Sequence, residues 1–416
     1  MPHCVRHDKR RVRLPDYVQR QLGNALCIAA ITSADGCSQT LLTPLLHQQG
    51  KDPTTIGALV AVSSVVALLM RIPGGLLYRP GRVRPLMAGA LAIAAVATFA
   101  HPLVVSSLGF AGVRLVYGIG YSISTTVNMA VFVDSISHEG DRRRASGMYA
   151  SAMASGYTIG GFVGGFLGQA LGFQGAYVVI AALWIAGLLP VFFRQPKIEA
   201  APTGAVNLAA RSTRAQAFSR VVADPLILSM VLAGFIINMQ QSLFVTFAPL
   251  VLLAIGLGVS QVGIQRGVFS LTNAITRPAA GYVLDRIDHH KAQTCGIMLN
   301  AASLFLFFLP LGFVPYLVLS VAAGFGRAVA VVANTVALTQ DVDPARVSRG
   351  VASGILNAAL DLGNIIGPVV GGVITSAFGL DRLWVIAPPL YVGTYLVSAT
   401  VLRRKRAQPA LAGVAS

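Results

Sequence analysis

The two halves of this chain repeat one another at a constant distance of 207 residues. Glycine, arginine and aspartate residues recur in the same order, as in the pairs Gly74/Gly281, Arg79/Arg286, Asp134/Asp341, Gly156/Gly363, Gly160/Gly367 and Gly172/Gly379. Agreement in one register over so many positions indicates a duplicated unit, and the unit is too long for a solenoid repeat. The segments inside each unit are strongly apolar. Membrane transporters are built from such repeats, with the substrate site between the halves.

The composition places the chain in a membrane. Hydrophobic residues make up 55% of it, the mean hydropathy is +0.69, and 11% of the residues are charged. A soluble domain has about 25% charged residues. The cysteines, which are Cys4, Cys27, Cys37 and Cys295, have no metal-binding or redox spacing, and we interpret them as small apolar residues.

Apolar runs of about 20 residues cross a bilayer. Twelve are expected, at residues 22–46, 54–77, 85–107, 109–133, 146–171, 174–193, 225–254, 260–282, 292–313, 315–340, 350–377 and 383–402. The predicted organisation is an N-terminal tail at 1–21, six helices at 22–193, a linker at 194–224, six helices at 225–402 and a C-terminal tail at 403–416. An even number of spans gives both halves the same orientation. The predicted fold class is therefore all-α integral membrane, with twelve transmembrane helices in two parallel six-helix repeats.

The positive charges predict the orientation. With the N-terminus inside, nearly all of the 32 Lys and Arg residues fall in cytoplasmic segments or within spans, and only Lys51 and Arg382 fall outside. The positive-inside rule therefore predicts that both termini are cytoplasmic and that the chain spans the inner membrane of the cell. This distribution also accounts for the net charge of +17, so we expect a lipid bilayer as the partner and no nucleic acid.

Seven charged residues fall within the predicted spans: Asp35, Arg71, Arg114, Arg266, Arg277, Arg327 and Asp361. A charge at the centre of a bilayer costs about 2.5–3.5 kcal/mol, so these side chains are expected to face a cavity or the protein interior. A helical rise of about 1.5 Å per residue places Asp35, Arg327 and Asp361 at a similar depth of roughly 20 Å. The expected ion pair joins Arg327 to Asp361 or to Asp35.

These charges have two interpretations. The first is a titratable centre, in which a carboxylate takes up or releases a proton as a nearby arginine moves. The candidate residues for such proton coupling are Asp35, Asp361, Arg114 and Arg327. The second is a static Arg–Asp pair that locks helices together, and it is stronger for Asp361, which precedes helix-packing residues.

Uncharged polar residues in the spans are candidates for a substrate cavity. They are Gln39, Tyr117, Tyr121, Asn128, Asn238, Gln240, Gln241 and Asn334. Burying an unpaired amide is costly, so each is expected to bond to another residue, to water or to substrate. The mixture beside Met239 and Phe244 favours a moderately polar organic substrate over an inorganic ion. For each residue alone, the alternative is a hydrogen bond between helices.

Glycine spacings in the fifth and eleventh spans predict close helix packing. The residues are Gly156, Gly160 and Gly164 in the first half and Gly363, Gly367, Pro368 and Gly371 in the second. The alternative role for these glycines is gating, in which two helices slide at close range.

Nearly the whole chain resembles the major facilitator superfamily. The signature of that family between its second and third helices is Gly-x-x-x-Asp-Arg-x-Gly-Arg. The first half has Gly74, Tyr78, Arg79, Gly81 and Arg82 at these positions, and the second copy has Gly281, Asp285 and Arg286. The resemblance implies a gating motif whose Asp clamps the cytoplasmic gate. Because Tyr78 replaces that Asp, the latch of the first half lacks its acidic group.

Two further motifs refine the resemblance. Arg114-x-x-x-Gly118-x-Gly120 is similar to a family motif linked to proton coupling. The family's antiporter motif has Pro where this chain has Gly161, and the Pro version stands instead in the eleventh span, at Gly367-Pro368. The resemblance therefore implies the twelve-helix drug or metabolite:proton antiporter group, which acts as a monomer.

Three functions follow from these observations. The leading hypothesis is efflux of a small organic molecule, a drug or a metabolite, by alternating access around a cavity lined by the first, fourth, seventh and tenth helices. It needs no cofactor, and the proton gradient is the driving force. The direct alternative is a proton-coupled uptake symporter, and the third is a non-transporting membrane sensor or assembly partner. An enzyme is not expected, because the sequence has no metal-ligand cluster, nucleophile elbow or phosphate loop, and His289 and His290 have no third ligand.

Overall fold

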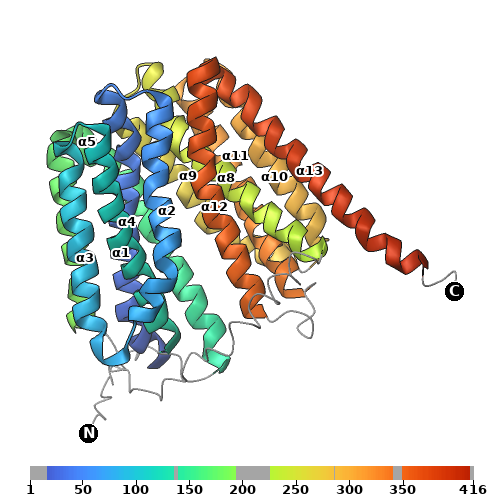
Figure 1. Cartoon of the computed structure of the whole chain (residues 1–416), viewed down its shortest axis with the longest axis horizontal. Helices are drawn as coiled ribbons and strands as arrows, with labels where there is room; N and C mark the ends of the chain where they lie inside the picture. Colours follow the sequence, from blue (N-terminus) through green and yellow to red (C-terminus); the bar gives the residue numbers. More distant parts are fainter. Residues whose placement is uncertain (1–15, 135–138, 194–224, 285, 341–348, 413–416) are drawn as a thin grey trace, which may run out of the picture.

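The computed structural model describes residues 16–134, 139–193, 225–284, 286–340 and 349–412 (Figure 1). Within these ranges the chain is helical and contains no β-strand. The first half contains α1 (Asp16–Gln48), α2 (Pro53–Leu77), α3 (Val83–Ala100), α4 (Ser107–Asp134), α5 (Glu139–Ala186) and α6 (Leu188–Phe193). The second half contains α8 (Pro225–Ala254), α9 (Val259–Leu284), α10 (His289–Phe305), α11 (Phe313–Gln340), α12 (Arg349–Phe378) and α13 (Leu380–Ala412). Short 3-10 turns occur at Pro80–Arg82, His101–Leu103 and Leu306–Phe308.

The structure repeats at the same distance as the sequence. The described residues with positive φ are all glycines: Gly50 (72°), Gly172 (64°), Gly256 (81°) and Gly379 (94°). They form two pairs, Gly50 with Gly256 and Gly172 with Gly379, which lie 206 and 207 residues apart. Glycine adopts positive φ without the steric penalty of a side chain, so the duplication includes the geometry of the turns. Gly172 divides the long helix α5 into the fifth and sixth predicted spans.

All twelve predicted spans fall on helices. Nine helices in the described part of the chain are long and apolar enough to cross a membrane, and one of the nine, α5 continued by the short α6, covers two predicted spans. The other two predicted spans correspond to α9 and α10. Helix α9 carries polar residues along one face, and α10 has 17 residues. The helices do not stop at the predicted span limits, since α1 begins at Asp16 and α13 continues to Ala412. Helical hydrogen bonding does not depend on apolar surroundings and continues past the apolar run. The predicted linker at 194–224 lies outside the described residues.

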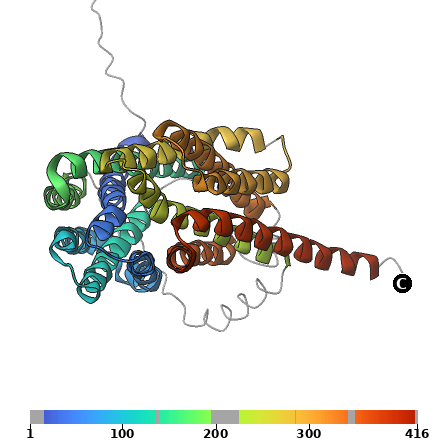
Figure 2. The ribbon, with the colours of Figure 1, turned by 90° about the horizontal axis from the view of Figure 1, so that it is seen from above.

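The two halves lie side by side. Helix α1 packs along α5 and α2 along α4 in the first half, while α8 packs along α12 and α10 along α11 in the second. The halves contact each other mainly through α2 with α12 and through α5 with α9. Figure 2 shows the blue and cyan helices of the first half on one side and the orange and red helices of the second half on the other. The cavity described below lies between them.

Glycines allow the two halves to approach closely at one end. A Cβ atom at Gly57 of α2 would overlap the carbonyl oxygen of Pro368 in α12, and a Cβ atom at Gly165 of α5 would lie 2.5 Å from the Cα atom of Gly263 in α9. The Thr54 hydroxyl, also at this end, donates to Ser376 at 2.8 Å. Figure 1 shows α2 and α12 close at their upper ends and separated at their lower ends. The two halves are therefore in tight backbone contact at the end that holds the start of α2, and the ribbons of α2 and α12 diverge toward the other end.

Within each half, the predicted packing glycines lie against a neighbouring helix. Added Cβ atoms at Gly156, Gly160 and Gly164 would come within 3.0 Å of α1, and Cβ atoms at Gly363, Gly367 and Gly371 would do the same with α8. The close approach of α1 to α5 and of α8 to α12 depends on this missing side-chain volume.

Candidate functional site

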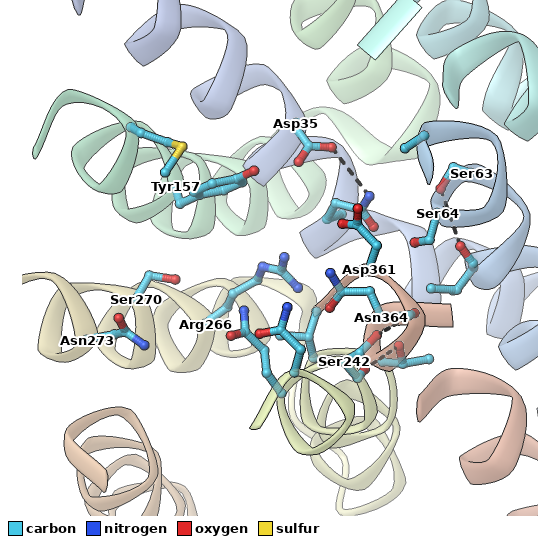
Figure 3. A pocket seen from close by; sticks show the side chains of 18 of the residues that line it. Asp35, Ser63, Ser64, Tyr157, Ser242, Arg266, Ser270, Asn273, Asp361 and Asn364 are labelled. Carbon is cyan, nitrogen blue, oxygen red and sulfur yellow. Dashed lines mark hydrogen bonds between the residues drawn. The ribbon is translucent and has the colours of Figure 1, made fainter. Parts of the chain in front are cut away.

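A cavity of about 390 Å³ lies between the two halves. It is lined by α1, α2, α4 and α5 from the first half and by α8, α9, α11 and α12 from the second (Figure 3). The first, fourth, seventh and tenth predicted helices are α1, α4, α8 and α11, and all four contribute. Helices α2, α5, α9 and α12 also contribute, because they form the contacts between the halves.

Asp35 is a buried carboxylate in this cavity. Asp35 has 5% of its surface exposed to solvent. The Tyr117 hydroxyl donates to its Oδ1 at 2.5 Å, and Gln39 Nε2 donates to the same oxygen at 3.4 Å. The positive charge of Arg266 on α9 attracts it from the other half. A hydroxyl, an amide and a distant cation therefore replace the water that a carboxylate normally binds.

Asp361 has a different environment, because it forms an ion pair across the two halves. Arg71 Nε lies 2.6 Å from Asp361 Oδ2, and Arg71 Nη2 donates to Oδ1 at 2.7 Å. The contact to Oδ1 is a charge-assisted hydrogen bond, and the contact to Oδ2 is an ion pair without hydrogen-bond geometry. The expected partner was Arg327, but Arg327 Nη2 donates instead to Asn238 Oδ1 of α8 at 3.2 Å. Depth along a helix does not reveal which helices of the two halves face each other, so the partner on α2 was missed.

Arg114 lies behind the cavity wall. It is fully buried, and it donates to the carbonyl oxygens of Leu59 and Val60, each at 3.3 Å, and to the Ser63 hydroxyl. Its guanidinium carbon lies 5.2 Å from the centre of the Tyr117 ring. Within the described structure Arg114 makes no hydrogen bond to Asp35, but it packs against Tyr117, which does. Arg114 is therefore a positioning residue for that tyrosine.

The predicted polar residues divide into two groups. Five line the cavity: Gln39, Tyr117, Tyr121, Asn238 and Gln241. The other three, Asn128, Gln240 and Asn334, are buried elsewhere. Asn334 accepts a hydrogen bond from Gln293 Nε2 of α10 at 2.8 Å, which is the interhelical alternative. Gln240 is adjacent to Gln241, and neighbouring residues of a helix point in different directions.

Helix α9 supplies two cavity residues that the sequence analysis missed, Ser270 and Asn273, beside two arginines that it expected to face a cavity or the protein interior without assigning them a role. Arg266, Ser270, Asn273 and Arg277 all line the cavity. Their spacing of four, three and four residues places them on one face of a helix. A polar stripe of this kind in an otherwise apolar span is the sequence pattern that could have identified these cavity residues. Figure 3 shows Arg266, Ser270 and Asn273 along the cavity side of α9.

The gating motif of the first half forms a contact of its own. The Tyr78 hydroxyl donates to Asp134 Oδ2, at the end of α4, at 2.6 Å. Partial burial, and then the hydrogen bond to Asp134, raise the pKa of Tyr78, so the hydroxyl keeps the proton that it donates. Tyr78 thus connects α2 to α4 from the position of the missing Asp. Gly74 is buried, Arg79, Gly81, Arg82 and Arg286 are exposed, and Gly281 is partly buried. Asp285 lies outside the described residues.

Over the residues that the structure describes, no cluster of three or more His, Cys, Asp or Glu side chains could hold a metal ion. The polar groups of the cavity are hydroxyls, amides, guanidinium groups and two carboxylates. Such a set can bind a solute, and its carboxylates can exchange protons.

The fold resembles those of solved transporters. A mutant form of the nucleoside transporter NupG superposes with a TM-score of 0.77 and 16% identity, covering 92% of this chain and 99% of that one. A bacterial homologue of the human lysosomal transporter Spinster, in an inward-facing and unoccupied conformation, gives a TM-score of 0.74 and 16% identity, covering 94% and 96% of the two chains. The human organic anion transporter MFSD10 (TETRAN) gives a TM-score of 0.63 and 18% identity, covering 94% of this chain and 100% of that one. At these identities the likeness concerns the fold alone.

The sequence itself carries the family assignment. No curated protein matches the chain. The model of the Major Facilitator Superfamily matches residues 25–348 and 230–414, which together include almost all of it. The family predicted from the motifs is thereby confirmed. The chain belongs to the Major Facilitator Superfamily, and it is a multi-pass membrane protein and a secondary transporter of small molecules, not an enzyme.

Proposed function

We propose that this transporter couples the movement of a small organic solute to proton movement through Asp35. The observation that supports the proposal is the contrast between the two carboxylates of the cavity. Asp361 is tied to Arg71, whereas within the described residues no Lys, Arg or His nitrogen lies within 4.0 Å of a carboxylate oxygen of Asp35. Asp35 can therefore gain and lose a proton without breaking an ion pair.

Protonation of Asp35 acts on the contact between the halves. Asp35 belongs to the first half and Arg266 to the second, and their opposite charges attract. A proton on Asp35 removes that attraction. The charge state of Asp35 thus changes the relative stability of conformations in which the halves are differently arranged. This dependence is what alternating access requires of a coupling residue.

Export is the proposed direction. The Gly367-Pro368 sequence of α12 resembles the antiporter motif of the family, and it lies where α12 meets α2 at the end of the glycine contacts. In this proposal the protein is a monomer of the inner membrane with both termini in the cytoplasm. The end opposite the glycine contacts, where Arg79, Arg82 and Arg286 lie, then faces the cytoplasm, and the cavity loads a drug or metabolite from inside.

Uptake symport is the second candidate, and the position of Arg266 favours it. When Asp35 is protonated, Arg266 loses its opposing charge and becomes available to a negatively charged solute. A proton and an anionic solute would then bind together, which is the order of a symporter.

Comparative mass spectrometry of cells and medium tests the proposal. Cells that produce the wild type are compared with cells that produce Asp35→Asn at matched levels in the membrane. Asp381→Asn, which removes an exposed carboxylate outside the cavity, is the control. We expect a compound whose distribution depends on the wild type and on Asp381→Asn but not on Asp35→Asn. Undiminished proton-driven transport by Asp35→Asn would exclude the role of Asp35.

The same data decide the direction. A compound enriched in the medium supports export, and a compound enriched inside the cells supports symport. If the wild type and empty cells do not differ, either the host lacks the substrate or the protein acts as a non-transporting sensor or assembly partner.

A further inference from the structure

The charges that line the cavity do not balance. Four arginines (Arg71, Arg266, Arg277 and Arg327) and two aspartates (Asp35 and Asp361) line it. The charge of Asp361 is compensated by Arg71. The three other arginines come from α9 and α11 of the second half and face one remaining carboxylate. The cavity therefore has an excess of positive charge even when both aspartates are ionised.

The contacts of these arginines leave part of each charge uncompensated. Arg277 Nε donates to Asn273 Oδ1 at 2.9 Å, and Arg327 donates to Asn238, so both bond to neutral amides. Among the described residues, no carboxylate oxygen lies within 4.0 Å of a nitrogen of Arg266, Arg277 or Arg327. The charges of Arg277 and Arg327 also repel each other. Burying unpaired cations is costly, and such groups normally have a counter-charge.

Buried donor atoms remain without a partner. Arg266 Nη1 and Arg327 Nε are enclosed by the protein and make no hydrogen bond within the described structure. Figure 3 shows Arg266 directed toward the middle of the cavity, on the side of Asp361 and Asn364. Buried donors of this kind are matched when a ligand supplies acceptor atoms, and guanidinium groups bind carboxylate and phosphate oxygens most strongly.

The rest of the wall is suited to an organic molecule. Phe269, Val245 and Met153 provide apolar surface, and Tyr121 and Tyr157 provide rings with hydroxyls. The volume of about 390 Å³ lies within the range of sites for small organic ligands, which is roughly 300–1,000 Å³. A simple inorganic ion would leave this surface unused.

We propose that the solute is a small organic anion, such as a carboxylate or a phosphate ester, whose charged group binds Arg266 and Arg327, while Arg277 adds to the positive potential. This inference rests on the proposed function only in taking the cavity as the transport site. It holds for export and for uptake.

Binding to the purified full-length protein in detergent tests the inference. The unfolding temperature is measured with matched compounds that differ in charge: benzoate, benzamide and benzylamine; succinate and succinamide; glucose 6-phosphate and glucose. Chloride at equal ionic strength is included throughout. We expect at least one anion to raise the unfolding temperature by about 2 °C or more above its neutral counterpart.

Variants then assign the effect to the arginines. Arg266→Gln and Arg327→Gln are each expected to weaken binding of that anion by about tenfold or more, since a charged hydrogen bond is lost. Arg382→Gln, which removes an exposed arginine outside the cavity, should leave binding unchanged. Asp35→Asn should tighten binding, because it removes the negative charge that attracts Arg266. A purely structural role for the arginines does not predict this gain.

Three results would overturn the inference: stabilisation only by neutral or cationic compounds, an equal shift with chloride alone, or an anion effect that survives both arginine substitutions. If no anion raises the unfolding temperature, the inference is overturned as well. Because binding is measured without a membrane or a gradient, a failure of proton coupling leaves this result unaffected. Proton-driven transport of a neutral compound would instead retain the coupling proposal and reject the anion.

Discussion

At the scale of single residues, two aspartates with similar depth have different surroundings. Asp35 is held by Tyr117 and Gln39, both from its own half, and it senses the other half only through the charge of Arg266. Asp361 bonds directly to Arg71 of the other half. The two interpretations of the intramembrane charges therefore separate. The titratable role suits Asp35, and the static pair describes Asp361 in this conformation.

The Arg71–Asp361 pair predicts the outcome of a double-mutant cycle. Arg71→Gln and Asp361→Asn should each lower the free energy of unfolding by about 1–2 kcal/mol, a reduced value because the Arg71 side chain is 52% exposed. In the double variant Arg71→Gln with Asp361→Asn the two losses should be less than additive, because either substitution alone already removes the ion pair. Thermal unfolding of the four proteins in detergent gives the coupling energy. Losses that simply add in the double variant would mean that the pair contributes no stability.

At the scale of helices, the closed end of the cavity depends on backbone contact. Gly57 and Gly372 bring α2 against α12, and a Cβ atom at Gly372 would lie 2.6 Å from the carbonyl oxygen of Pro53. Gly165 and Gly263 do the same for α5 and α9. Backbone atoms cannot turn aside as a flexible side chain can, so these helix pairs either touch or separate. This property suits helices that close one end of a transporter.

Substitution of one of these glycines should open the contact. Gly57→Ala is expected to cost about 1–3 kcal/mol of stability, as overpacking does, because its Cβ would overlap Pro368. Gly89→Ala, in α3, is the matched control: no heavy atom lies within 4 Å of the added Cβ, and alanine favours the helix. Thermal unfolding distinguishes the two substitutions. If both variants are equally stable, α2 and α12 can move apart without a loss of free energy of unfolding, and the close contact does not stabilise the protein.

At the scale of the whole molecule, the structure represents one conformation of a transport cycle. The glycine contacts close the end that holds the turns at Gly50, Gly172, Gly256 and Gly379, and α2 and α12 separate at the other end (Figure 1). Among the described residues, Arg79, Arg82 and Arg286 follow α2 and α9 at that other end. In the proposed orientation this end faces the cytoplasm.

Chemical labelling from each side of the membrane checks this orientation. With Cys4 and Cys295 replaced by Ser, a cysteine at cavity residue Ser64 should react with a membrane-impermeant thiol reagent added from the cytoplasmic side. It should be protected from the outside, because the contacts of α2 with α12 and of α5 with α9 block access. Asp381→Cys, which is exposed at the closed end, should show the reverse pattern. Labelling of the Ser64→Cys variant only from outside would reverse the assigned orientation.

The sequence alone determined the features that depend on local pattern. Apolar length, the constant repeat and the glycine turns depend on residues near one another or at a fixed distance, so twelve helical spans in two like halves were predictable. Helical rise also predicted that Asp35, Arg327 and Asp361 share one depth, and all three line the cavity.

Only the tertiary structure decided which helices of the two halves face each other. The pairing of Arg71 with Asp361 depends on the meeting of α2 and α12, whose residues lie 290 positions apart, and no periodicity within a helix encodes that contact. The same reason placed Asn334 against Gln293 of α10 and brought the polar stripe of α9 into the cavity. The local sequence pattern determines which side chains lie on each face of a helix. The packing of whole helices determines which residues those side chains contact.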